Sequence, residues 1–206
     1  RIQDRDGIFI KQKVDILEAL TGCEQGNTYY VFPLGKDGDK KGKKFYKAKE
    51  KSSCTSKYCM SGECRPFKLR LNLEDDSEEL DNEPFLLLDR PCKCTIYCFN
   101  RPELTVTYVQ DGANDYLGKV KDIWTCCNIV LELYDANGNM RYIIEGSCFQ
   151  IGMHCKGPMD CCETIDFEIK SPSGEILSTL QKRSPGCAAA MISDSDNFAV
   201  HFPNNA

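Results

Sequence analysis

The sequence lacks any apolar run long enough to cross a membrane as a helix. Its longest candidates are "PFLLL" (residues 84–88) and "CAAAMI" (residues 187–192), whereas a spanning helix needs about 20 mostly apolar residues. The chain also begins at Arg1 without a signal-peptide pattern. We therefore expect that residues 1–206 do not span a bilayer and that they are part of a longer protein.

Catalytic motifs and a strong charge bias are missing as well. The only histidines are His154 and His201, and there is no Ser-His-Asp order, phosphate-binding Gly loop or paired-His metal motif. The formal net charge of -5 gives no general reason to expect binding to nucleic acid or attraction to anionic lipid. We predict a protein that is not an enzyme and has no nucleic-acid partner.

The pattern that is present is a series of short β-favouring runs separated by turn residues. Ten runs stand out, at residues 28–32, 43–49, 65–73, 85–89, 104–109, 128–135, 140–146, 164–171, 175–182 and 197–203. In "RPFKLRLNL" the apolar residues from Phe67 to Leu73 alternate with polar ones, as in a half-buried antiparallel strand. "DANGN" (135–139) and "SPSGE" (171–175) have the chemistry of tight hairpin turns. One all-β sandwich or barrel over residues 1–206 is predicted. Residues 14–22 suit either a short helix or a strand.

Six blocks in order resemble the phospholipid scramblase family. They are "LEALTG" (17–22), "RPFKLRL" (65–71), "LDRPCKC" (88–94), "GKVKDIW" (118–124) leading to "LELYDANGN", "DFEIKS" (166–171) and "DSDNFAVHFP" (194–203). The resemblance implies a closed antiparallel Tubby-like β-barrel of about twelve strands around a hydrophobic C-terminal helix. This chain ends at Ala206 without that helix. We expect an apolar helix beyond residue 206, a partner segment, a lipid or a collapsed lumen to replace it.

The resemblance also implies calcium-activated, ATP-independent, bidirectional movement of phospholipids between leaflets. It implies a protein that is intracellular and membrane-associated at the cytoplasmic face, held there by the C-terminal helix, by acylated cysteines or by both. Membrane phospholipids are the expected partners, with protein partners as a further hypothesis. The alternative is a membrane-associated lipid-binding or scaffold module without transport, because a closed barrel gives headgroups no polar path across hydrocarbon.

In the family the segment matching residues 194–205 is described as a calcium site like an EF-hand. The six ligand positions here are Asp194, Asp196, Phe198, Val200, Phe202 and Asn205. Only two are carboxylates, and Asn205 stands where a bidentate Glu is wanted, so any calcium binding should be weak. The alternation of Phe198, Val200 and Phe202 favours a strand over an ion loop.

The fourteen cysteines leave three hypotheses open. Zinc binding would use thiolates from separate loops, with candidates Cys54, Cys59, Cys64, Cys148, Cys155, Cys161 and Cys162. Resemblance to the family's palmitoylated stretch points to Cys92, Cys94 and Cys98. Buried thiols that pack as small apolar groups are the third hypothesis. The single tryptophan, Trp124, is expected in the core.

Overall fold

A computed structural model describes residues 5–13, 27–51, 66–73, 84–93, 99–110, 112–154, 164–183 and 196–202. The elements in chain order are β1 (Gly7–Gln12), β2 (Thr28–Pro33), β3 (Tyr46–Lys51), β4 (Phe67–Leu73), β5 (Leu86–Arg90), β6 (Glu103–Gln110), β7 (Ala113–Ile123), β8 (Asn128–Asp135), β9 (Met140–Ser147), α3 (Ile151–His154), β10 (Thr164–Lys170), β11 (Ile176–Arg183) and β12 (Asn197–His201). The predicted helix or strand at 14–22 lies outside the described residues.

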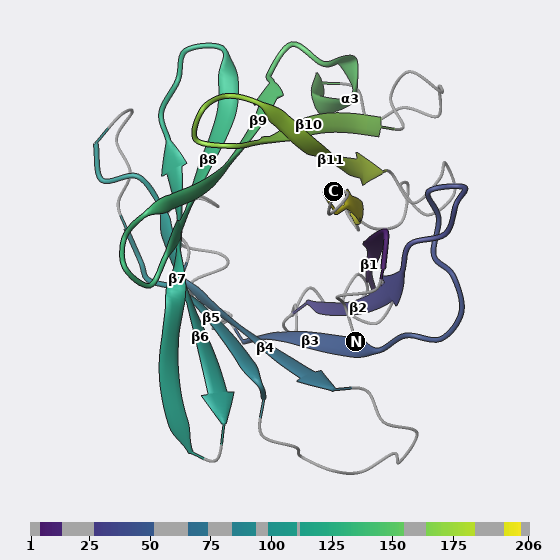
Figure 1. Cartoon of the computed structure of the whole chain (residues 1–206), viewed down its shortest axis with the longest axis vertical. Helices are drawn as coiled ribbons and strands as arrows, with labels where there is room; N and C mark the ends of the chain where they lie inside the picture. The colour runs from purple at the N-terminus through teal and green to yellow at the C-terminus, as the bar shows by residue number, and fades with distance from the viewer. Residues whose placement is uncertain are drawn as a thin grey trace, which may run out of the picture.

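The twelve strands form one closed barrel, in which each strand pairs antiparallel with its neighbours in the chain. The barrel closes where β1 pairs with β12, with Phe9 opposite Ala199 (Figure 1). All ten predicted runs coincide with strands, so the predicted all-β barrel is confirmed. None of the ten predicted runs corresponds to β1 or β7.

Two hairpins have the turn chemistry that the sequence indicates. Between β8 and β9 the Asp135 carboxylate accepts hydrogen bonds from the backbone N–H groups of Asn137 (3.0 Å) and Asn139 (2.9 Å). Gly138 adopts a φ of 82° there, a conformation that glycine takes without steric cost. Between β10 and β11, Ser171 and Glu175 close an equivalent turn through a 2.8 Å backbone hydrogen bond. These short turns fix the register of the strands that they join.

Side chains pack on both faces of β1. One cluster contains Phe9, Leu34 and Ala199, with Phe32 against it. The other contains Val31, Phe45 and Tyr46, with Ile8, Ile10 and Phe85 against it. Because Leu34 begins the β2–β3 connection, which runs outside the ring of strands in Figure 1, the first cluster lies outside the barrel and the second inside.

The inner face is mainly apolar, with tyrosines beside aliphatic residues. Tyr29, Ala48, Leu71, Leu86 and Tyr108 are successive cross-strand partners, so their side chains lie on the same face of strands β2 to β6. Among the described residues no large side chain is completely buried, so these inward-facing groups keep part of their surface accessible. How the barrel is filled stays a prediction.

Candidate functional site at the cysteine rim

The topology divides the connections between strands into two sets, one at each end of the barrel. The connections β1–β2, β3–β4, β5–β6, β7–β8, β9–β10 and β11–β12 join strand ends at one end, which we call the cysteine rim. These six segments contain all fourteen cysteines: Cys23; Cys54, Cys59 and Cys64; Cys92, Cys94 and Cys98; Cys126 and Cys127; Cys148, Cys155, Cys161 and Cys162; and Cys187. The strands and the connections of the opposite rim contain none.

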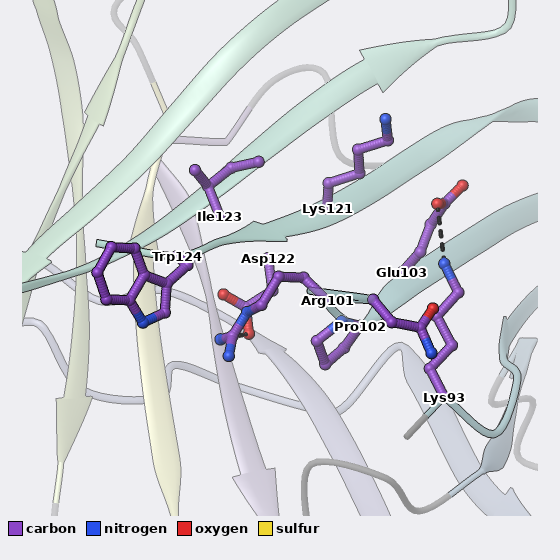
Figure 2. A pocket seen from close by; sticks show the side chains of 9 residues that line it. Lys93, Arg101, Pro102, Glu103, Lys121, Asp122, Ile123 and Trp124 are labelled. Atoms are coloured by element: carbon purple, nitrogen blue, oxygen red, sulfur yellow. Dashed lines mark hydrogen bonds and ion pairs between the residues drawn. The ribbon is translucent and has the colours of Figure 1, made fainter. Parts of the chain in front are cut away.

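A pocket of about 380 Å³ opens at this rim, and we call it the rim pocket. Its lining residues are Lys93, Asn100, Arg101, Pro102, Glu103, Lys121, Asp122, Ile123 and Trp124. They come from the β5–β6 connection, the start of β6 and the end of β7 (Figure 2). Sequence reasoning missed this pocket, because its members belong to separate segments without a common motif.

Local backbone features bring these segments together. Asn100 has a φ of 52°, which Asn tolerates better than most residues, and it turns the chain into Pro102 and β6. The first residue of β6, Glu103, pairs directly with Lys121 on β7. The Asp122 N–H donates to the Pro102 carbonyl at 3.0 Å. The pocket is therefore built on a sheet register rather than on a loop alone.

Ion pairs order the charged side chains of the pocket. Glu103 accepts from Lys93 at 3.2 Å and from Lys119 at 3.3 Å, and Arg101 contacts Asp122 at 2.5 Å. Burial raises the pKa of Glu103, but its hydrogen bonds with the two lysines outweigh that effect and hold the pKa below its ordinary value. Glu103 is therefore ionised at neutral pH and shared between two cations.

Lys121 and Trp124 complete the pocket. The Lys121 ammonium lies 5.4 Å from the centre of the Tyr134 ring, and Lys121 makes no ion pair within the described part of the chain. Trp124 follows the last residue of β7, and its side chain is 48% exposed. The prediction that Trp124 packs in the core is therefore wrong. The strand ends one residue before it, and the ring lies at the mouth of the pocket beside the Arg101–Asp122 pair (Figure 2).

Of the predicted acylation sites, Cys92 is exposed and directly precedes Lys93 of the rim pocket. Cys94 and Cys98 lie outside the described residues. Of the predicted zinc ligands only Cys148 is described, whereas Cys54, Cys59, Cys64, Cys155, Cys161 and Cys162 are not. Within the described ranges no three His, Cys, Asp or Glu side chains form a metal-binding group. Acylation and zinc binding both stay predictions.

Three described thiols gather where the β7–β8 connection meets the end of β9. The Cys148 N–H donates to the Cys127 carbonyl at 3.1 Å, one pair beyond the end of the β8–β9 ladder. Cys126 and Cys127 are exposed and Cys148 is half-buried, all three as free thiols. A hydrogen bond with Cys126 raises the pKa of the Cys127 thiol, which keeps it protonated and weakly nucleophilic at neutral pH.

The predicted calcium ligands are placed along β12. Phe198 and Val200 belong to the strand, Asp196 precedes it and Phe202 follows it. At about 3.3 Å per residue the extended chain separates Asp196 from Phe202 by roughly 20 Å. The Asp196 carboxylate is paired with Lys182 at 2.8 Å.

The predicted strand is thus confirmed. Coordination of one ion by the whole set would require the chain to leave its pairing with β1 and β11. Asp194 and Asn205 lie outside the described residues, and calcium binding stays a prediction.

Comparison with known proteins identifies the family. The sequence profile described as Scramblase matches residues 1–206, the whole chain. The chain belongs to the scramblase family. Within the described residues, no helix has both the length and the apolar character that crossing a membrane requires. No solved structure matches the chain significantly.

Relatives in the scramblase family include phospholipid scramblase 1 of Mus musculus, which is 29% identical over 201 residues. That match covers 96% of this chain and 54% of the mouse protein. Phospholipid scramblase 2 of Bos taurus is 28% identical over 199 residues, covering 96% of this chain and 60% of the bovine protein. Phospholipid scramblase 1 of Homo sapiens is 28% identical over 199 residues, covering 96% and 56% respectively. The chain therefore spans little more than half the length of these relatives.

Proposed function

We propose that this scramblase-family protein moves phospholipids in both directions between membrane leaflets, in response to calcium and without ATP. The observation that carries the proposal is the match of the family profile to all 206 residues. The cysteine rim supports it, because it combines a cationic pocket with exposed aromatic and thiol side chains, the groups that suit a bilayer interface.

Reconstitution of the full-length protein into vesicles tests this function. A fluorescent phospholipid in both leaflets would be bleached from outside by a reductant that does not cross the bilayer. We expect the protected fraction to fall over time with calcium and no ATP, and to persist in vesicles without protein. Equal protected fractions with and without protein, whatever the calcium level, would reject transport.

A second function is favoured by the inner face of the barrel. Most of its side chains are apolar, so a charged headgroup would pay a large desolvation penalty on entering. A lipid-binding or protein-interaction module without transport activity fits this face better. Vesicle binding without any change in transbilayer rate would identify this alternative.

Membrane attachment at the cytoplasmic face through acylated cysteines is part of the same proposal. Cys92 is exposed beside the rim pocket, and two acyl chains anchor a protein stably where one chain does not. Replacement of thioester-linked acyl groups by a mass tag in cells should shift the protein by more than one tag. Cys92→Ser should remove one of them, and an unshifted wild-type protein would refute acylation.

A further inference from the structure

We propose that the rim pocket binds the phosphate of an anionic phospholipid headgroup, with the cysteine rim facing the bilayer and Trp124 entering the interface. This inference rests on the proposed function, since it specifies how the protein engages its lipid. It assigns a lipid-binding role to Lys93, Arg101 and Lys121, whose side chains line one pocket.

The charge of the site favours an anion. Lys93, Arg101 and Lys121 line the pocket, and Lys119 reaches the same carboxylate as Lys93. Glu103 and Asp122 are the only acidic residues of the lining, so its three cations face two carboxylates and a surplus of one positive charge remains. The ion pairs hold the cations in place before a ligand arrives, which lowers the entropy cost of binding.

The other lining groups favour an amphipathic anion over a small soluble one. Pro102, Ile123 and Trp124 supply apolar surface beside the cations. Phe99, one residue before the pocket, is 72% exposed. A pocket of about 380 Å³ has room for a headgroup and part of its glycerol, and aromatic rings prefer the depth at which these groups lie in a bilayer.

The charge of the segment beside the pocket also favours contact with an anionic surface. Residues 91–102 contain two basic residues, Lys93 and Arg101, and no acidic one. An anionic surface would therefore attract this part of the cysteine rim.

Trp124 provides the measurement, because it is the only tryptophan of the chain and it lines the pocket. Its emission would be recorded while the protein is titrated with phosphatidylcholine vesicles, with and without phosphatidylserine. A calcium chelator in the buffer separates this binding from any calcium effect. We expect a blue shift that requires the anionic lipid, and quenching by lipids that carry bromine near the headgroup. Unchanged emission with both vesicle types would overturn the proposal.

Two lysine variants and a matched control test the location. Lys121→Gln and Lys93→Gln should each weaken vesicle binding about fivefold, the effect of about one cation near an anionic surface. Lys41→Gln makes the same charge change on an exposed residue of the β2–β3 connection, at the opposite rim, and should leave binding unchanged. Circular dichroism would confirm that each variant is folded. Equal losses in all three would show general electrostatic attraction and overturn the assignment.

Two further comparisons are needed. One distinguishes a lipid headgroup from free phosphate as the ligand, and the other distinguishes headgroup binding from lipid transport. Inorganic phosphate at constant ionic strength should shift Trp124 emission far less than vesicles do. A shift equal to that with vesicles would assign the pocket to a soluble phosphate compound and overturn the lipid proposal. Vesicle binding through the pocket without lipid movement would reject transport but keep the headgroup site. If Lys93→Gln and Lys121→Gln leave both lipid movement and vesicle binding unchanged, the headgroup site is rejected and transport is kept.

Discussion

Glu103 limits the positive charge of the rim pocket, and its neutral substitution Glu103→Gln should strengthen binding to anionic vesicles. The carboxylate lies 3.2 Å from the Lys93 ammonium and 3.3 Å from that of Lys119. Glutamine keeps the shape but removes the charge, so the surplus in the pocket rises by one unit. With about 1 kcal/mol per charge near an anionic surface, we expect binding to tighten about fivefold.

The same substitution should lower the stability of the fold. Each half-exposed ion pair contributes up to about 1 kcal/mol, so we expect Glu103→Gln to lower the free energy of unfolding by about 1 kcal/mol. The lysines hold the pKa of Glu103 below its unfolded-state value. The stabilisation is therefore complete above the unfolded pKa and is lost as the pH falls through the folded pKa. The stability difference between wild type and variant should disappear in acid.

Vesicle sedimentation and urea unfolding at several pH values measure these effects. Glu175→Gln is the matched control, because it removes one charge from the exposed turn between β10 and β11 at the opposite rim. It should change neither binding nor stability appreciably. Weaker binding by folded Glu103→Gln would refute the charge argument and would mean that Glu103 mainly positions Lys93 and Lys119.

Three further predictions follow from the barrel itself. A Cβ at Gly118 would overlap the Tyr134 carbonyl oxygen, so Gly118→Ala should lower the urea-unfolding free energy by about 2–4 kcal/mol. A Cβ at Gly174 would meet open space, so Gly174→Ala should lower the unfolding free energy only by the left-handed backbone strain, about 1–2 kcal/mol. A loss for Gly174→Ala equal to or larger than that for Gly118→Ala would contradict the clash at Gly118. The hydrogen bond between Lys170 and Glu145 lowers the pKa of Glu145 and raises that of Lys170. The stabilisation from this pair should therefore be lost as the pH falls through the pKa of Glu145 or rises through the pKa of Lys170. In a plot of melting temperature against pH, Glu145→Gln should flatten both the acidic and the alkaline decline. The accessible apolar inner face should bind an apolar dye such as ANS, and an unbound dye would indicate a filled barrel.

Sequence patterns were sufficient for ten of the twelve strands. In β4 the alternation from Phe67 to Leu73 reports directly on a sheet with one apolar face. In β7 it does not, because the register shifts between Val106 and Thr107 of the partner strand, next to Gly118. The shift moves the side chains that follow to the other face, so a period of two residues is lost over the strand. In β1, Ile8, Phe9 and Ile10 are consecutive because both faces of the strand are packed, so no alternation marks it.

The rim pocket was beyond sequence reasoning for a related reason. Glu103 and Lys121 become neighbours only through the pairing of β6 with β7, and β7 was not among the predicted strands. Trp124 in "DIWTCC" suggests a residue within a strand, and a large aromatic side chain on a strand is expected to pack in the core. Once β7 ends at Ile123, the same residue is the first of a connection and is exposed.

The two missing strands also hid the distribution of the cysteines. In a barrel of antiparallel neighbours, successive connections alternate between the two ends, so one overlooked strand changes the end to which every later segment belongs. If the connections are numbered from β1–β2 as the first to β11–β12 as the eleventh, every odd-numbered connection contains cysteine and no even-numbered one does. Since the predicted acylation and zinc residues all belong to odd connections, both hypotheses concern the rim that holds the cationic pocket. Cys92 directly precedes Lys93 of the rim pocket, so acylation of this thiol should alter headgroup binding as well as attachment.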